Sequence, residues 1–170
     1  MRKVEVLPHN PKWHDLFNAE SKSIAKALQV VAIHHIGSTS ITDIYAKPIV
    51  DILVEVKDIN NVNTCNGAME TLGYQAMGEF GIIDRRYFRK HKMGVRTHHV
   101  HVFETDSPQV TRHLAFRDYM NAHPTDAKQY SELKRKLAAK YPDDIESYMD
   151  GKDAFIKEID RKAALWQKAI

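Results

Sequence analysis

The stretch Pro48-Ile49-Val50-Asp51-Ile52-Leu53-Val54-Glu55-Val56 decides the fold class. It is β-branched and nearly continuously apolar, which is typical of a central strand with both faces covered. A proline suits the first position of such a strand, because there it removes no hydrogen bond from the interior of the ladder. The Asp51 carboxylate inside this run needs a cation, a metal ion or hydrogen-bond donors beside it. We therefore predict a buried strand that carries a candidate functional acid.

The segments on either side of this strand alternate between helical and extended patterns. Before it, the apolar spacing of residues 11–30 predicts a helix, and the short β-branched run 30–36 predicts a strand. Gly37-Ser38-Thr39-Ser40 predicts a turn that opens a short helix to about residue 46. After it, the patterns predict a helix over 58–72, a strand over 74–78, a hairpin of strands over 85–91 and 98–104, and helices over 108–122, 125–140, 143–149 and 152–169.

Such segregated runs favour an α+β fold with a small mixed sheet, helices on one side of it and a C-terminal helical region. The length of 170 residues suits a single domain over 1–170, with the sheet in residues 1–106 and the helical region in 107–170. No apolar run of about 18 residues predicts a membrane span, and the N-terminus lacks a signal-peptide core. Cys65 is the only cysteine, which excludes a disulfide framework. We expect a cytoplasmic protein with no membrane partner, and its oligomeric state stays open.

Charge is unevenly distributed along the chain. The formal net charge of +3 is too mild to indicate a nucleic-acid-binding protein. Residues 1–84 hold 7 basic and 10 acidic residues, whereas residues 85–170 hold 18 and 12. The sharpest block, residues 85–96, contains no acid and six bases: Arg85, Arg86, Arg89, Lys90, Lys92 and Arg96. It is either a solvated basic hairpin or a site for phosphate, whose oxygens match the guanidinium fork.

The Gly37-Ser38 turn and the acid that follows it form the first candidate site. Backbone N–H groups of a Gly-Ser turn that opens a helix can receive a phosphate. Lys47 precedes the strand that carries Asp51 and could pair with it. Two interpretations stay open: Asp51 is a structural acid satisfied by Lys47 or by a backbone turn, or it binds a ligand or metal ion.

His99 and His101 form the second candidate site. Alternation along a strand places both imidazoles on one face, where they can share a metal ion or supply a general base. A half-exposed surface strand would show the same pattern. If their strand neighbours that of Asp51, the three residues make a two-histidine, one-carboxylate set suited to a divalent metal ion, with Mg²⁺, Mn²⁺ and Zn²⁺ all considered.

Two clusters of basic residues lie on the predicted helices. Arg112, His113 and Arg117 share adjoining helix positions, either to face an anionic ligand or to make ordinary ion pairs. On the later helix we interpret a basic group as a solvated face and a stripe of Leu133, Leu137 and Tyr141 as core. The basic group consists of Lys128, Lys134, Arg135, Lys136 and Lys140.

Several motifs together resemble the GrpB family. They span nearly the whole chain in the family's order: residues 34–40 (HHIGSTS), 46–52 (AKPIVDI), 85–88 (RRYF), 96–102 (RTHHVHV), 112–119 (RHLAFRDY), 123–124 (HP) and 130–134 (YSELK). This family is placed in the nucleotidyltransferase superfamily, whose fold is typified by DNA polymerase beta. The resemblance implies a small mixed sheet whose Gly-Ser turn holds a triphosphate next to metal-binding carboxylates.

The resemblance also implies two sets of site residues. Asp51, His99 and His101 are the expected catalytic and metal-binding set. The expected phosphate- or substrate-binding set is Gly37, Ser38, Thr39, Lys47, Arg85, Arg86, Tyr87, Arg112, His113 and Arg117. The implied ligand is a nucleotide or another phosphorylated small molecule.

The sequence departs from the superfamily pattern at the second acid. Active members carry an acid-x-acid pair, but Ile52 and Leu53 follow Asp51, and Glu55 lies about 13 Å further along the strand. Residues 41–43 (ITD) also stand where the family has Val-Pro-Gly. Two functions stay open: a metal-dependent nucleotidyl- or phosphoryl-transfer enzyme, and a non-catalytic nucleotide- or anion-binding module. Nucleic-acid binding is disfavoured, because only Tyr87 and Phe88 interleave the basic block.

Overall fold

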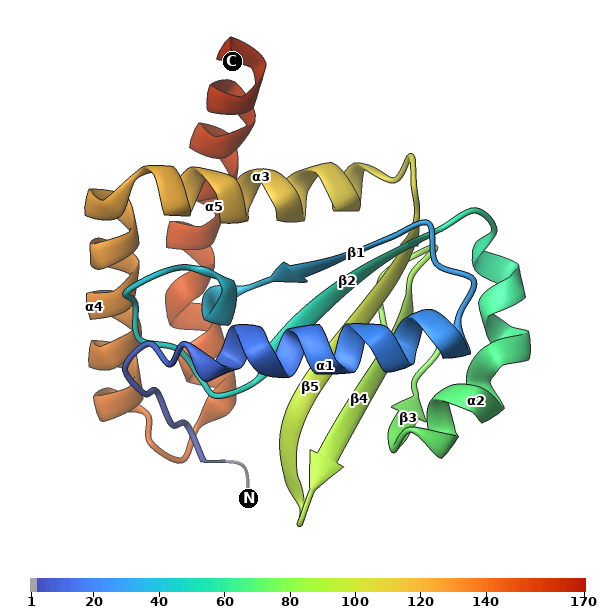
Figure 1. Cartoon of the computed structure of the whole chain (residues 1–170). Helices are drawn as coiled ribbons and strands as arrows, with labels where there is room; N and C mark the ends of the chain where they lie inside the picture. Colours follow the sequence, from blue (N-terminus) through green and yellow to red (C-terminus); the bar gives the residue numbers. More distant parts are fainter. Residues whose placement is uncertain (1–2) are drawn as a thin grey trace.

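The computed structural model describes residues 3–170 and contains one five-stranded sheet in the order β1-β2-β5-β4-β3 (Figure 1). The strands are β1 (Ala32–Ile36), β2 (Val50–Val56), β3 (Tyr74–Ala76), β4 (Arg86–Lys92) and β5 (Val95–Glu104). The central pair, β2 and β5, is parallel, and the other three pairs are antiparallel. The mixed sheet and the α+β class are therefore confirmed.

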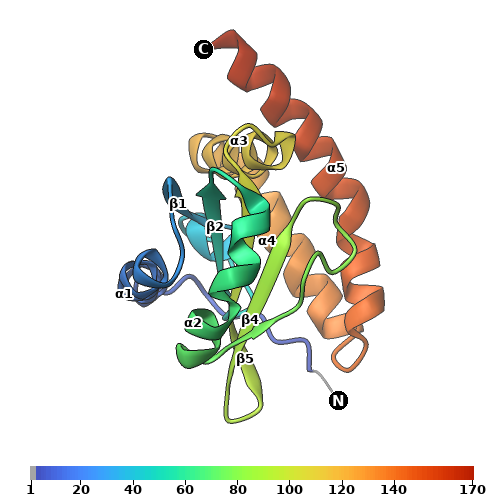
Figure 2. The same ribbon diagram turned by 90° about the vertical axis from the view of Figure 1, so that its right-hand side faces the viewer.

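Helices lie against both faces of this sheet, as the view in Figure 2 shows. α1 (Lys12–Ala27) and α2 (Asn66–Thr71) cover one face. The C-terminal region consists of α3 (Pro108–Ala122), α4 (Pro124–Lys140) and α5 (Ile145–Ala169). α3 places Val110 and Leu114 against Leu53 and Phe103 on the opposite face. No helix within residues 3–170 is both long and apolar enough to cross a membrane.

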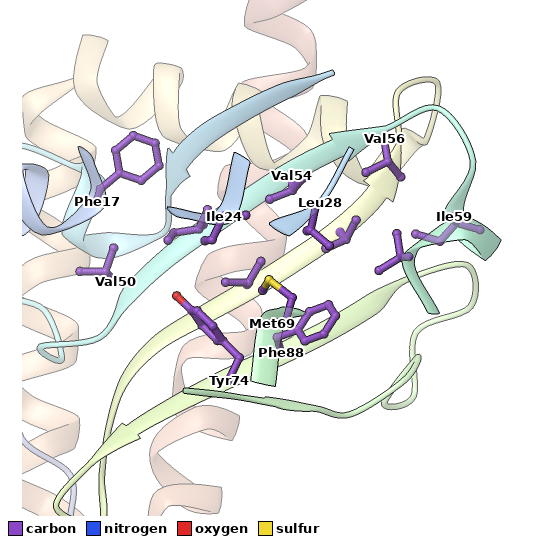
Figure 3. Close-up of a cluster of buried hydrophobic side chains, with 14 of the residues drawn as sticks. Phe17, Ile24, Leu28, Val50, Val54, Val56, Ile59, Met69, Tyr74 and Phe88 are labelled. Carbon is purple, nitrogen blue, oxygen red and sulfur yellow. The ribbon is translucent and has the colours of Figure 1, made fainter. Parts of the chain in front are cut away.

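The main core lies between the sheet and helices α1 and α2 (Figure 3). Alternation along β2 directs Val50, Val54 and Val56 to this face, where Ile24 and Leu28 of α1 cover them. The intervening residues of β2 therefore face the C-terminal helices. That parity places Asp51 on the side of the sheet where the candidate site forms.

Four predicted helices differ from those observed. Past Gly37 the chain makes only a 3-10 turn, Ser38–Ser40, and the helix predicted over 58–72 begins as a 3-10 segment before α2. The two helices predicted around Gly151 are one continuous helix, α5. A Cβ at Gly151 would stand 2.5 Å from Leu137 Cδ2. This glycine therefore permits close packing of α5 on α4 and does not end a helix.

The predicted inner and outer faces of α4 are only partly confirmed. The helix buries Ala127, Tyr130, Ser131 and Lys134, while the predicted stripe of Leu133, Leu137 and Tyr141 is only half-buried. The other basic residues of the group are exposed as predicted: Lys128, Arg135, Lys136 and Lys140. A buried lysine on this helix therefore requires its own explanation.

His35 joins β1 to α1 and makes stability dependent on pH. Its ring stacks on Phe17 with 5.0 Å between centroids, and its Nε2 lies 2.9 Å from Thr39 Oγ1. Burial, reinforced by His14, lowers the pKa of His35 to about 4. Between pH 7 and 5 the unfolded chain therefore binds a proton that the folded chain excludes, and we expect the free energy of unfolding to drop by about 1–2 kcal/mol through this group.

Urea unfolding at pH 7 and pH 5 checks this expectation. His35→Gln, which cannot titrate, should lose that much less stability between the two pH values than the wild type loses. Equal losses in His35→Gln and the wild type would contradict the assignment.

Candidate functional site

A pocket of about 450 Å³ lies where the end of β1, strands β2 and β5 and helices α3, α4 and α5 meet. Its walls combine cationic, imidazole and apolar side chains with a single carboxylate. Five of the lining residues come from the strands of the sheet, and eight come from helices α4 and α5 or the segment that precedes β2. The polar lining residues are Gly37, Ser38, Lys47, Asp51, Arg96, His99, His101, Arg112, His113, Tyr130, Lys134, Tyr148 and Lys152.

Asp51 is the centre of a hydrogen-bonded cluster on the sheet. The parallel register sets Asp51 opposite His99. Asp51 Oδ1 lies 3.3 Å from His101 Nε2 and 3.5 Å from His99 Nδ1. Burial acts to raise the pKa of Asp51, but the contacts from the two imidazoles hold that pKa well below its usual range. The strands thus bring together all three residues of the predicted catalytic set.

Arg85 orients the imidazole of His101 from the side opposite Asp51. Its Nη1 lies 3.3 Å from His101 Nδ1. A guanidinium can only donate, so Nδ1 of a neutral His101 accepts and Nε2 carries the proton that faces Asp51. Carbonyl oxygens of Glu79 and Phe80 accept from the rest of the guanidinium. Arg85 is buried and does not line the pocket, and neither does Tyr87, whose ring centroid lies 5.4 Å from that of His101.

A metal ion does not fit the three predicted ligands as they stand. Asp51 Oδ1 already contacts both imidazoles directly. Within residues 3–170, no group of three His, Cys, Asp or Glu side chains is placed to hold a metal ion. We therefore derive no step through a metal ion, and a divalent metal at Asp51, His99 and His101 stays a prediction.

Gly37 and Ser38 line the pocket beside Asp51. Gly37 has φ 73° and ψ −173°, a conformation that is essentially restricted to glycine. A Cβ there would stand 2.6 Å from Asp51 Oδ2, so the turn approaches the carboxylate as closely as a backbone can. Thr39, predicted with them, is buried outside the pocket lining, and its hydroxyl contacts His35.

The predicted arginines divide between the pocket and the rest of the molecule. Arg112 lines the pocket and contacts Gln109 and Asp160. Arg86 pairs with Val102 in the ladder, which places it on the opposite face of the sheet, where its Nε donates to Asn63 Oδ1 at 2.8 Å. Arg117 also lies outside the pocket lining: it donates to the His35 carbonyl and to Asp118, and so ties α3 to β1.

His113 lies beside Arg112 at the pocket wall. Its ring centroid is 5.8 Å from that of His101. Burial, with Arg112 as the next cause, lowers the pKa of His113 to about 3. His113 is therefore a neutral imidazole at physiological pH and contributes polarity without charge.

Sequence reasoning missed the lysines that reach the pocket from α4 and α5. Lys134 is 1% exposed, its Nζ lies 4.4 Å from the Tyr130 ring centroid, and that Nζ has no hydrogen-bond partner. Lys152 is 6% exposed, and its Nζ lies 4.7 Å from the Tyr148 ring centroid. A tyrosine precedes each lysine by four residues, which places the two side chains on one helix face. This Tyr-x-x-x-Lys spacing, which occurs on both helices, is the sequence signal that could have indicated the two lysines.

Lys47, predicted beside Asp51, also lines the pocket. Its Nζ lies 5.4 Å from the Tyr148 ring centroid and 3.8 Å from Met149 Sδ, so it contacts α5. The segment before β2 and the last helix are thereby joined at the pocket.

Comparison with known proteins assigns the chain to a family. The chain is a member of the GrpB family: a family model described as "GrpB protein" matches residues 3–162. The UPF0157 protein YqkA of Bacillus subtilis is 47% identical over 98% of this chain and 49% of its own length. The glutamate-rich protein GrpB of Alkalihalophilus pseudofirmus is 37% identical over 92% of this chain and 94% of its own length.

A solved structure supports the same assignment. The crystal structure of the conserved protein GrpB from Enterococcus faecalis has a TM-score of 0.90 and 43% sequence identity, and it covers 94% of this chain and 96% of that one. The chain spans about half the length of the Bacillus relative and 66% of a Pseudomonas aeruginosa relative, UPF0157 protein PA4798, which is 40% identical over 92% of this chain. The family resemblance seen in the sequence is thereby confirmed.

Proposed function

We propose that this protein binds a phosphorylated small molecule, such as a nucleotide, in the pocket. The observation that carries the proposal is the charge of the lining. The only lining carboxylate, Asp51, is already engaged by two imidazoles. Against it stand five basic side chains from five parts of the fold: Lys47, Arg96, Arg112, Lys134 and Lys152. Such an excess of convergent cations favours a ligand with several negative charges.

The remaining walls suit the body of such a ligand. Phe116, Ile49 and Ile156 contribute apolar surface, and the rings of Tyr130 and Tyr148 add flat faces. The volume of about 450 Å³ is in the range of small-molecule pockets. A phosphorylated compound with an apolar or aromatic part therefore matches the pocket in charge and in size.

Nucleotidyl or phosphoryl transfer is a second candidate function, favoured by the position of Asp51 directly beside the Gly37-Ser38 turn. This arrangement is the one that nucleotidyltransferase-like membership implies. On β2 the other acid, Glu55, is held by His34 at 2.5 Å, away from the pocket. A single carboxylate favours binding without turnover, since the two-metal mechanism needs several oxygen ligands.

Thermal unfolding with ATP, GTP and inorganic pyrophosphate tests the binding proposal. A ligand at a hundredfold excess over its Kd should stabilise the protein by about 2.7 kcal/mol. Arg112→Met, inside the pocket, should weaken binding about tenfold. Arg86→Met, on the opposite face of the sheet, is the matched control and should bind like the wild type. No response to any phosphate compound, or equal losses in the two variants, would overturn the proposal.

Transfer is tested by incubating the protein with labelled nucleoside triphosphates and Mg²⁺, Mn²⁺ or Zn²⁺. Product that disappears in both Asp51→Ala and His101→Ala would support the transferase. Binding without product supports the non-catalytic module. Turnover that survives both substitutions would refute the assignment of these residues to the chemistry.

A further inference from the structure

Two buried lysines from neighbouring helices converge on the α4–α5 side of the pocket. Lys134 on α4 and Lys152 on α5 both line it, and both are almost inaccessible to solvent. Lys152 is the first charged neighbour that depresses the pKa of Lys134. Buried ammonium groups that face each other inside a protein are unfavourable without a counter-ion.

Asp51 favours the charged form of Lys152, but it forms no ion pair with that amine and is already engaged by His99 and His101. Among the ion pairs formed by residues 3–170, none includes Lys134 or Lys152. Lys134 Nζ also lacks a hydrogen-bond partner, as does the buried hydroxyl of Tyr148. A methionine or leucine could fill either position with no desolvation cost. The two amines are therefore placed to meet a charge that comes from outside the chain.

The amine of Lys134 lies close to the turn that also lines the pocket. Ser38 hydrogen-bonds with Tyr130, whose ring centroid is 4.4 Å from Lys134 Nζ. The Gly37-Ser38 turn and the amine of Lys134 thus both contact Tyr130. An oxyanion group bound there has access to a turn from the sheet and to an ammonium from the helical region.

We propose that Lys134 and Lys152 bind the anionic group of the ligand, and that the two amines take up protons from solvent when it binds. This inference rests on the proposed function and deepens it. It adds two lysines of α4 and α5 to Arg112 as groups that bind the ligand's negative charge. It also makes the affinity of the pocket depend on pH.

The direction of the pH dependence follows from the groups around the amines. The charged neighbours of Lys134 are Lys47 and Lys152. Those of Lys152 are Lys47 and Asp51. Each amine also lies over the ring of a tyrosine on its own helix, Tyr130 for Lys134 and Tyr148 for Lys152. The other titratable groups of the pocket are Arg96, His99, His101, Arg112 and His113. Burial lowers the pKa of Lys134 well below its usual value and that of Lys152 to about 8. A bound anion favours the charged amines, so affinity should rise as the pH falls through this range.

Isothermal titration calorimetry with ATP tests the inference between pH 7.5 and 9.5, where the phosphates of ATP are fully ionised. Wild-type affinity should fall about tenfold over this range. Titrations in two buffers of different ionisation enthalpy should reveal net proton uptake on binding. Lys134→Met and Lys152→Met should each weaken binding about tenfold or more and reduce the proton uptake.

Lys136→Met is the matched control, because Lys136 is an exposed lysine on the same helix. It should bind ATP and take up protons like the wild type. If ATP binds the wild type but both buried-lysine variants bind equally well without a change in proton uptake, this inference is overturned and the proposed function stands. If no phosphate compound binds the wild type, the proposed function fails and this inference fails with it.

Discussion

Replacing Lys134 by methionine is expected to make the ligand-free protein more stable. The amine is buried without a hydrogen-bond partner or a counter-ion, and methionine fills a similar volume without that cost. We expect a gain of about 1–3 kcal/mol in the free energy of unfolding at pH 7. The gain should shrink as the pH approaches 10, because the amine of the unfolded wild-type chain then also loses its proton. Urea unfolding at several pH values measures both effects.

The Lys136→Met variant distinguishes the effect of burying a lysine from the effect of removing its charge. Lys136→Met removes an exposed ammonium from the same helix and should change stability by less than about 0.5 kcal/mol. A Lys134→Met protein less stable than the wild type would show that the amine has a structural role. A variant that is more stable and binds ligand poorly would instead identify Lys134 as a group kept for binding at the expense of stability.

Replacing Gly37 by alanine is expected to destabilise the protein strongly. At φ 73° and ψ −173° a side chain is strained, and its Cβ would stand 2.6 Å from Asp51 Oδ2 and 3.0 Å from Asp51 Cβ. We expect a loss of about 2–4 kcal/mol in the free energy of unfolding. Because Asp51 must move to relieve the overlap, its contacts with His99 and His101 should also be disturbed.

Gly67→Ala provides the comparison. Gly67 lies in α2, and a Cβ there meets nothing within 4 Å. Alanine should be neutral or stabilise by up to about 1 kcal/mol, since it favours helix. Urea unfolding of the two variants measures the difference. An unchanged Gly37→Ala protein would contradict the close approach of the turn to Asp51.

The sheet was largely predictable because its signals are local. The apolar run of β2, the alternation on β4 and β5 and the Gly37 turn each appear within a few residues of sequence. The parallel pairing that joins Asp51 to His99 and His101 was stated only as a condition, since no local pattern fixes which strands are neighbours. For the same reason, the sequence did not show on which face of the sheet Arg86 lies. Its face depends on its pairing with Val102, and register is a long-range property.

The helical half of the pocket was not predictable by the same means. Lys134 stands among exposed Arg135 and Lys136, so composition suggested a solvated face. Only packing against α5 shows that the buried face of α4 contains Tyr130 and Lys134. The position of Arg117 outside the pocket lining was not predictable for a related reason, because its carbonyl acceptor at His35 lies 82 residues away in the chain.

The parallel ladder between β2 and β5 also has a consequence for folding kinetics. The pocket residues that it joins, Asp51 and His101, are separated by 50 residues in the chain. A contact of that separation carries a loop-closure cost before it yields any stabilisation, which slows folding. During synthesis, one edge of the apolar β2 strand stays unpaired until β5 has left the ribosome. The nascent chain thus passes through a stage with an open, aggregation-prone strand edge, and the pocket is completed only after the later helices α3, α4 and α5 have packed on the sheet.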